Sequence, residues 1–382
     1  EHEQAWAVSK QRPNTVHAAF LRGCMANTVN GLWDSFIDFE NIYRGYYAAA
    51  RGKRYRDEVL AFKANLEDNL FSLIDDLRCD SYVPLPLRQF WITDPKRRLI
   101  SAPAFRDRVV HHALVRIIEP VFERRFINES FACRVGRGTH AAMRHVFKCT
   151  QLAKRRWGDY YVLKCDVSKF FPSINHNILK RTIRRSLRDK RVLCLIDTII
   201  QSHESAGQDG AGIPIGALTS QLFANVYLDP LDHYLKETCQ IKFYARYMDD
   251  FVIIHQDKAF LRELLGKIET FLHDRLAVNL NPKTELFPGK HAVDFCGYRI
   301  WPTHIKPRKR TVKRARRRLK KLARIYQNDP KSLEHAKASM MSFLGYVKHC
   351  SGLKTTRSIL RSAAFKAGKK PALPDNAPQG QK

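Results

Sequence analysis

An acidic pair at positions 249 and 250 constrains this chain more than any other feature, because both of its flanks are apolar. Residues 241–246 and 251–254 have the pattern of strands, so Asp249 and Asp250 are predicted at a tight hairpin. Upstream, the apolar segment 160–167 is predicted as a strand that ends on Asp166. Adjacent carboxylates repel each other unless a cation offsets their charge. Three carboxylates at the ends of neighbouring strands can hold a pair of Mg²⁺ ions, so the pattern favours a nucleic-acid polymerase.

The competing interpretation of these acids is an ordinary solvated surface. Asp accepts turn geometry readily, so an isolated Asp-Asp pair in a turn usually has no function, and an aspartate that closes a strand is equally common. Here both acidic segments lie between apolar strands rather than in polar loops. The occurrence of both acidic segments in this apolar context therefore favours a functional site over a solvated surface turn.

The charge balance of the chain indicates a polyanionic partner. The 382 residues include 67 Lys and Arg against 37 Asp and Glu, a net charge of +30. A compact chain with this excess is self-repelling, and nucleic acid is the partner expected to neutralise it. A membrane surface is the rival polyanion, but the sequence has no apolar run of membrane-spanning length and no secretory signal. We therefore expect nucleic-acid binding without a membrane.

The nine cysteines bear on metal binding and on localisation. They are scattered without a Cys-x-x-Cys pair, which argues against structural zinc and against a disulfide framework. This usage suits a reducing cytoplasm, and a bacterial or phage-infected cell is the expected setting. Cys165 and Cys296 are predicted to be small core residues in strands.

Hydrophobic periodicity predicts a mixture of helices and strands along the chain. Two helices are expected within 32–77, separated by the basic link 51–54, and a β-hairpin within 82–101 with its turn at 94–95. Further helices are predicted at 105–126, 140–152, 219–236, 258–276 and 333–346, with helical stretches up to about 204, a glycine-rich loop at 207–216 and one β segment at 293–301.

A dense basic segment follows the last β segment. Residues 306–324 contain twelve Lys or Arg and no acid, while Val312, Leu319 and Leu322 keep helical spacing. A solvated charged face usually mixes signs, so this single-sign face is predicted to lie on phosphates. The residues expected to contact nucleic acid here are Lys309, Arg310, Lys313, Arg314 and Arg317.

Seven segments, in the expected order along the chain, resemble the conserved motifs of reverse transcriptases. Residues 166–174 resemble motif A, 212–221 motif B, Tyr247-Met248-Asp249-Asp250 motif C, 280–284 motif D and 295–298 the primer grip. Upstream, 95–100 and 105–110 resemble the fingers motifs, so the likeness covers roughly residues 30 to 350. The resemblance implies an α+β fold of the right-hand polymerase type, with fingers, a palm built on an antiparallel sheet, and a helical thumb.

The resemblance also implies domain boundaries. An N-terminal extension is expected at 1–27, fingers at 28–159, palm at 160–302, thumb at 303–365 and a flexible tail at 366–382. No endonuclease or ribonuclease H domain is expected.

The roles implied by the resemblance are those of a two-metal nucleotidyl transferase. Asp166 and Asp249 would ligate two Mg²⁺ ions with the Val167 carbonyl, Asp250 would support them, and Mn²⁺ could substitute. Phe171 would exclude a 2′-hydroxyl from the incoming deoxynucleotide, one of Phe170 and Phe171 being simply core. Lys96, Arg97 and Arg98 would bind the triphosphate, and Lys283 would protonate the leaving pyrophosphate. Gly216 would allow the template–primer backbone to approach closely. Gly297 and Tyr298 would contact the primer.

The sequence of motif B resembles one particular group of reverse transcriptases. Its form Ile215-Gly216-Ala217-Leu218-Thr219-Ser220-Gln221 resembles reverse transcriptases of diversity-generating retroelements. That likeness implies copying of a cognate structured RNA into cDNA from dNTPs, with misincorporation at template adenines tied to Ile215 and Gln221. It also implies a small basic accessory protein as partner.

Three alternatives remain open. Related reverse transcriptases of phage-defence systems share the same core and make cDNA from a non-coding RNA. An intron maturase would be expected to carry further domains after the thumb. A catalytically inactive RNA-binding scaffold is disfavoured, because all three acids, the aromatic at 171 and the basic residues near 97 are present.

Overall fold

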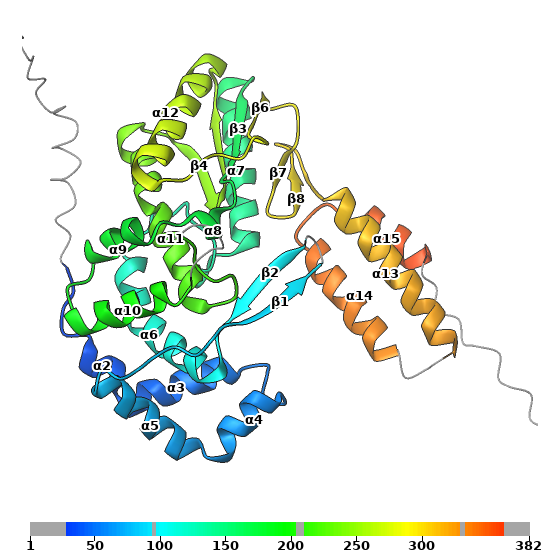
Figure 1. Cartoon of the computed structure of the whole chain (residues 1–382). Coiled ribbons are helices and arrows are strands. Elements are labelled where there is room, and N and C mark those ends of the chain that lie inside the picture. The colour runs from blue at the N-terminus through cyan, green and yellow to red at the C-terminus, as the bar shows by residue number, and fades with distance from the viewer. Residues whose placement is uncertain (1–27, 94–96, 204–209, 329–332, 363–382) are drawn as a thin grey trace, which may run out of the picture. The chain divides into compact units, whose positions relative to one another are not determined.

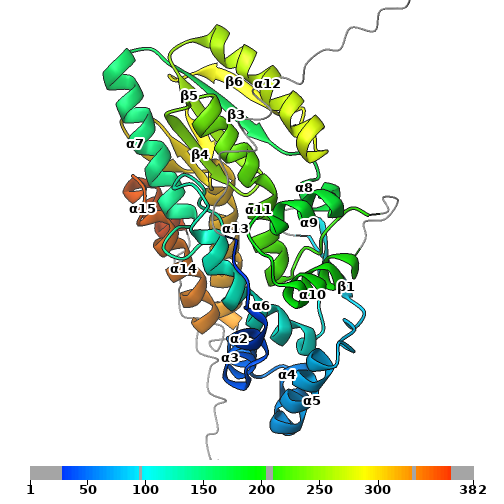
Figure 2. The same cartoon turned by 90° about the vertical axis from the view of Figure 1, so that its left-hand side faces the viewer.

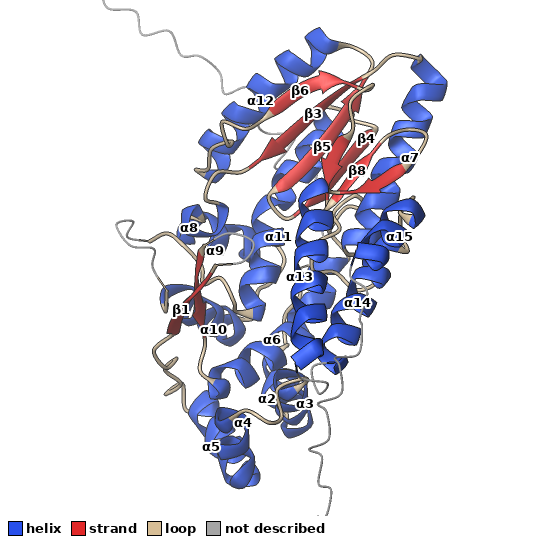
Figure 3. Cartoon of the chain, turned by 90° about the vertical axis from the view of Figure 1, so that its right-hand side faces the viewer, coloured by secondary structure: helices blue, strands red, loops and turns tan. Residues whose placement is uncertain are grey.

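The computed structural model describes residues 28–93, 97–203, 210–328 and 333–362. Helices and antiparallel sheets are mixed along the chain, so the predicted α+β class is confirmed (Figures 1 and 3). The chain divides into two compact units, one formed by Glu1–Phe126 with Lys169–Pro230 and the other by Ile127–Ser168 with Leu231–Lys382. The predicted extension at 1–27, the turn at 94–95 and the predicted tail lie outside the described residues.

The first unit is mainly helical and carries one β-hairpin. Its helices are α2 (Trp33–Ile37), α3 (Phe39–Ala50), α4 (Asp57–Ala64), α5 (Leu66–Arg78), α6 (Phe105–Glu123), α8 (Phe170–Ser173), α9 (His176–Arg184) and α10 (Lys190–Gln201). The hairpin pairs β1 (Arg88–Ile92) with β2 (Arg98–Ala102) in antiparallel register. Helix α11 (Leu218–His233) begins in this unit and ends in the second, where the π-helical turn η1 (Tyr234–Thr238) continues it.

Four helices replace the two predicted between residues 32 and 77. The apolar period continues across each break, but Asp38 leaves helical geometry and its carboxylate accepts a hydrogen bond from the Asn41 N–H. This N-cap starts a new helix and so overrides the periodic pattern. A second break lies at Asn65, whose backbone departs from helical geometry between α4 and α5. The basic link at 51–54 lies in the turn between α3 and α4, where it was predicted.

The second unit is built on a four-stranded antiparallel sheet with the order β4-β5-β3-β6. Its strands are β3 (Tyr161–Asp166), β4 (Phe243–Tyr247), β5 (Asp250–His255) and β6 (Glu285–Pro288). Helix α7 (Thr139–Trp157) packs on β4 and β5, and α12 (Lys258–Leu276) contacts β3 (Figure 2). Successive strand residues point to opposite faces, and Val162, Leu163, Phe251 and Val252 are all buried, so both faces of the sheet are covered.

The single β segment predicted at 293–301 is instead a hairpin within a three-stranded sheet. Its strands are β7 (Val293–Phe295), β8 (Tyr298–Ile300) and β9 (Ile305–Pro307). Cys296 and Gly297 form the turn, with φ of 48° and 90°, and a short apolar run does not reveal such a reversal. The prediction that Cys296 lies in a strand is therefore wrong, because it is a turn residue, but it is half-buried and packs against the core of this unit.

Three helices complete the second unit. They are α13 (Lys309–Asn328), α14 (Leu333–Val347) and α15 (Leu353–Ser362), which pack side by side (Figure 1). Their shared core is a small cluster of Leu319, Phe343, Val347 and Ile359. Helix α14 was predicted at nearly these bounds, whereas α15 was not predicted.

Candidate active site on the central sheet

The three acids of the predicted site are brought together by strand pairing in the second unit. Strands β3 and β5 are antiparallel neighbours, and their register places Asp166 directly opposite Asp250. The Val167 N–H donates to the Asp249 carbonyl over 3.2 Å, which continues the pairing into the turn. Met248 adopts a left-handed φ of 56° there. The prediction that the two acidic segments end neighbouring strands is confirmed.

Asp250 carries the clearest sign of an uncompensated negative charge. Its side chain is 26% exposed, and its buried Oδ1 has no hydrogen-bond partner among the described residues. The Lys164 ammonium lies 3.9 Å from that oxygen. The pKa of Asp250 is raised to about 7, mainly by burial, with the charges of Asp166 and Asp249 adding to the rise and those of Lys164 and Arg308 opposing it. A cation at this edge of the sheet would lower that cost.

Asp166 is held by a loop that sequence analysis treated only as a motif. The Asn281 side-chain amide donates to Asp166 Oδ2 over 2.9 Å, and its backbone N–H donates to the Asp166 carbonyl over 2.7 Å. Lys283 lies in the same loop, exposed to solvent, and its N–H donates to Asn281 Oδ1 over 3.1 Å. Asn281 is therefore a site residue that the sequence analysis missed.

A buried ion pair supports the turn that carries Asp249. Arg246 and Asp232 are both fully buried, and the Arg246 Nε donates to Asp232 Oδ1 over 2.7 Å. The Tyr244 hydroxyl donates to the same oxygen over 2.6 Å, and an Arg246 Nη donates to the Met248 carbonyl over 3.1 Å. The turn is thus tied to the interior of the unit. An arginine in an otherwise apolar strand was the only sequence signal of this network.

The predicted primer-grip residues lie at the β7–β8 turn and contact α14. The Tyr346 hydroxyl donates to the Gly297 carbonyl, and the Tyr298 hydroxyl donates to the Tyr346 carbonyl over 3.0 Å. The two tyrosine rings stack with centroids 4.7 Å apart. Arg308, just before α13, also pairs with Asp294 of β7. The last helices and this hairpin therefore form one connected structure.

Helix α13 presents the predicted basic face. Leu319 is buried in the cluster with α14 and α15, and Val312 and Ala315 pack against it. The five basic residues named for nucleic-acid contact are all exposed: Lys309, Arg310, Lys313, Arg314 and Arg317. The helix is amphipathic, as predicted, with a basic outer side.

The predicted nucleotide-binding residues belong to the first unit. Phe170 is 2% exposed and packs near Tyr227, whereas Phe171 is half-buried. Only Phe170 is thus a fully buried core residue. Gln221 is exposed on α11.

Motif B and the β-hairpin meet within this unit. The Ser101 N–H donates to the Ile215 carbonyl over 3.1 Å. Gly216 has a φ of +129°, and a Cβ there would lie 3.0 Å from Ile100 Cγ2. Glycine is therefore required on conformational grounds at position 216.

Two of the three predicted triphosphate residues can be placed. Arg98 is exposed on β2, and the Arg97 guanidinium lies 4.2 Å from the Trp91 ring centroid. Lys96 lies outside the described residues.

Two features are absent from the described part of the chain. No group of three or more His, Cys, Asp or Glu side chains there is arranged to hold a metal ion. Of the helices described, none has the length and apolar character needed to cross a membrane.

Comparisons with known proteins give the family. The chain is 30% identical over 281 residues to Protein YkfC from Escherichia coli (strain K12), covering 62% of this chain and 72% of that protein. It is 25% identical over 207 residues to the group II intron-encoded protein LtrA from Lactococcus lactis, covering 52% of this chain and only 33% of LtrA. Among solved structures, telomerase from Candida albicans, in complex with a TWJ fragment of telomeric RNA, has a TM-score of 0.45 at 14% identity, covering 73% of this chain and 55% of that one.

The family profile itself matches more than half of the chain. Residues 93–300 match the family described as reverse transcriptase (RNA-dependent DNA polymerase). This range includes Asp166, Asp249 and Asp250 together with every residue predicted to bind the nucleotide, from Lys96 to Gln221. The chain therefore belongs to the reverse transcriptase family.

Proposed function

We propose that this chain extends a primer with deoxynucleotides along an RNA template, using Asp166, Asp249 and Asp250 as its catalytic carboxylates. The observation that carries the proposal is the β3–β5 register, which sets Asp166 opposite Asp250 beside the turn of Asp249. A purely structural acid would be expected to have its oxygens satisfied, and Asp250 Oδ1 is not.

The donor set suits Mg²⁺ in its chemistry, although the side chains are not arranged around an ion in the described residues. Asp166, Asp249 and the Val167 carbonyl offer only oxygen, the ligand that Mg²⁺ prefers, and Asp250 adds a supporting charge. When bound, two such ions lower the pKa of the primer 3′-hydroxyl and neutralise the triphosphate, and Mn²⁺ can replace them. Asn281 orients the Asp166 carboxylate, while the Arg246–Asp232 pair fixes the backbone that presents Asp249.

The substrate contacts follow the assignments made from sequence. Phe171 excludes a ribose 2′-hydroxyl, which gives selection for dNTPs. Lys96, Arg97 and Arg98 hold the triphosphate, and Lys283 protonates the leaving pyrophosphate. Gly216 admits the template–primer backbone, Gly297 and Tyr298 position the primer, and α13 follows the phosphates of the duplex. The exposure of Arg98, Lys283 and the basic face of α13 supports these roles.

We place the enzyme with diversity-generating retroelements on its motif B. It copies a cognate structured RNA in the cytoplasm of a bacterial or phage-infected cell, with errors at template adenines set by Ile215 and Gln221 and with a small basic accessory protein as partner. The defence-type role remains the alternative. The likeness to a group II intron-encoded protein favours a further candidate, an intron-associated role.

Primer extension distinguishes these candidates. The chain is incubated with Mg²⁺, dNTPs and an adenine-containing RNA template, and the products are sequenced. Errors concentrated at adenines support the retroelement role, whereas faithful or untemplated DNA favours the defence role. Binding of an intron RNA by the chain, together with faster splicing of that RNA, favours the intron role. Absence of DNA with every template would contradict polymerisation.

Salt dependence tests the role of α13. Replacing Lys313, Arg314 and Arg317 by Gln should weaken binding to all RNA sequences alike and reduce the slope of log K against log salt by up to about 3. The slope is measured by titration from low to moderate salt. An unchanged slope would show that this face does not contact phosphates.

A further inference from the structure

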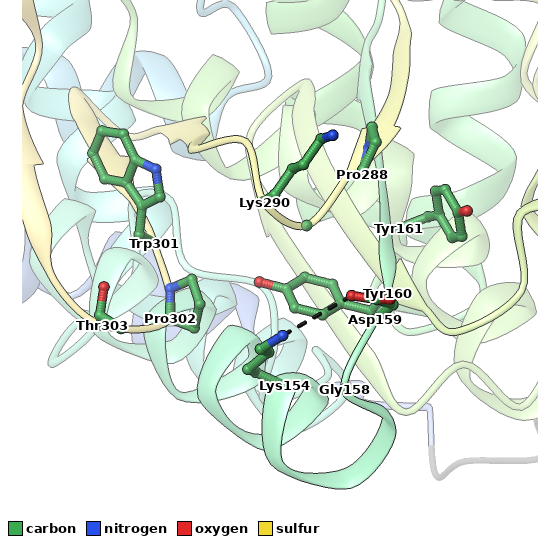
Figure 4. A pocket seen from close by; sticks show the side chains of 11 residues that line it. Lys154, Gly158, Asp159, Tyr160, Tyr161, Pro288, Lys290, Trp301, Pro302 and Thr303 are labelled. Carbon is green, nitrogen blue, oxygen red and sulfur yellow. Dashed lines mark ion pairs between the residues drawn. The ribbon is translucent and has the colours of Figure 1, made fainter.

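A second concave site lies in the second unit, at the end of β3 remote from Asp166. Its volume is about 360 Å³, which falls in the range of small-molecule sites. It is lined by the end of α7, the start of β3, the loop after β6 and the loop after β8, and Figure 4 shows these side chains around one hollow. Five residue steps along β3 separate Tyr161 from Asp166, or about 16 Å, so an occupant would not be the reacting nucleotide.

The floor of the pocket is an unsatisfied phenol. Tyr160 is 3% exposed, and its hydroxyl has no hydrogen-bond partner among the described residues. Figure 4 shows the ring extending across the pocket with this hydroxyl towards the side of Trp301 and Pro302. Burial raises the pKa of Tyr160 to about 12, so the hydroxyl remains a donor at neutral pH. An occupant that brings an acceptor would satisfy it.

Positive charge surrounds the pocket. Lys154 and Lys290 line it and are exposed, and Arg299 and Lys306 lie 5.0 and 5.6 Å from the Trp301 ring centroid. The one lining acid, Asp159, lies 4.0 Å from the Lys154 ammonium, but its side chain is fully exposed, so water screens its charge. The balance favours an anionic occupant.

The walls are apolar and their shape is fixed. Pro288 lies on one side of the hollow and Pro302 and Trp301 on the other, and one face of the Trp301 ring stacks on His304. The Gly289 N–H donates to the Tyr160 carbonyl over 2.7 Å, and a Cβ on Gly289 would lie 2.3 Å from the Tyr160 ring. A glycine is therefore needed for the loop to close on this ring. The occupant needs both a flat apolar part and an anionic part.

We infer that this pocket binds a nucleoside phosphate, with Lys154 and Lys290 on the phosphate, the Tyr160 hydroxyl on an acceptor and the base between the apolar walls. The source is either one nucleotide of a single-stranded RNA or a free mononucleotide. This site is separate from the proposed polymerase site and does not require that the chain synthesise DNA.

Photolabelling tests the inference with two probes. The full chain is irradiated with 4-thiouridine 5′-monophosphate or with an octaribonucleotide containing one 4-thiouridine, and labelled peptides are identified by mass spectrometry. Labelling of the peptides with Tyr160 or Trp301 is expected. Labelling by the octamer alone identifies an RNA strand as the source, and labelling by the mononucleotide identifies a free nucleotide.

Matched variants separate the pocket from general RNA affinity. Lys154→Ala with Lys290→Ala should lower pocket labelling about tenfold, as expected when two weak charge contacts are lost. Lys148→Ala with Lys242→Ala removes the same charge from exposed positions outside the pocket and should leave labelling unchanged. Tyr160→Phe keeps the ring packing and should lower labelling about threefold. Equal labelling in both double variants, or no label at the pocket with either probe, would overturn the inference.

Discussion

Two carboxylates at the β4–β5 hairpin differ in their surroundings: Asp250 begins β5, and Asp232 pairs with Arg246 of β4. Asp232 is fully buried, paired with Arg246, and accepts a hydrogen bond from Tyr244. Asp250 is partly exposed, has an unsatisfied oxygen, and has a lysine no closer than 3.9 Å. A charge that stabilises a fold is matched by its neighbours, whereas a charge kept for a ligand is not. The difference separates the structural acid from the proposed catalytic one.

Removing a catalytic carboxylate should give the largest effect on synthesis. Asp249→Ala and Asp250→Ala should each lower the rate of primer extension by about a thousandfold or more, because the metal ions would lose a ligand or supporting charge. RNA binding and the circular dichroism spectrum should stay unchanged. If these variants failed to fold, or still synthesised DNA, Asp249 and Asp250 could not be distinguished from the structural acid Asp232.

Removing the structural carboxylate should give the largest effect on the fold. Asp232→Asn leaves Arg246 charged and buried, so the free energy of unfolding should fall by about 3–5 kcal/mol in urea denaturation. Glu263→Gln breaks an exposed pair with Lys267 and serves as the control, with a cost below about 1 kcal/mol. If the two substitutions lowered the free energy of unfolding equally, the buried pair would contribute no more to stability than an exposed pair.

The pH dependence of stability should distinguish Asp250 from ordinary surface acids. Its pKa is about 7 in the folded chain against an ordinary value of 3.8, so ionisation lowers stability progressively between pH 4 and 7. Asp250→Asn lacks this titration and should be more stable by on the order of 2–4 kcal/mol at pH 8 without divalent ions. Near pH 4 the advantage should vanish. Thermal unfolding across this range, with EDTA and then with Mg²⁺, measures it; an advantage that does not change with pH would contradict the assignment.

Lys164 should give the smallest effect. Its ammonium lowers the pKa of Asp250, so Lys164→Met should raise that pKa by roughly one unit or less. The midpoint of the pH–stability curve should then move to higher pH. Lys242→Met, at an exposed position, provides a matched loss of charge. A shift of the midpoint to lower pH would mean that another group titrates.

Sequence reasoning found the parts of the site that depend on local pattern. The strands around Asp166 and the Asp-Asp turn were predicted, and α12 has the bounds predicted for it. The family match confirms a reverse transcriptase, an RNA-dependent DNA polymerase. The family likeness was carried by short ordered motifs, which survive where overall identity is low.

The missed features depend on contacts between distant residues or on single backbone reversals. Arg246 pairs with Asp232, 14 positions away, and Asn281 bonds to Asp166, 115 positions away. Hydrophobic periodicity cannot reveal either contact. The helix break rests on Asp38 alone, and the β7–β8 turn rests on Cys296 and Gly297, each within a segment of apolar pattern. Strands β6 and β9 are short, and only their pairing with β3 and β8 defines them.

The contact of Tyr346 with Gly297 has a consequence for how this chain can be shortened. A fragment ending before residue 333 would retain every proposed catalytic carboxylate and the whole of the central sheet. It would lose the phenol that closes on the β7–β8 turn and the carbonyl that receives the Tyr298 hydroxyl. The turn would then loosen, and Tyr298 would keep only its contact with His140 and the packing of the core around it. Truncation before α14 is thus expected to impair primer positioning before it affects the carboxylates.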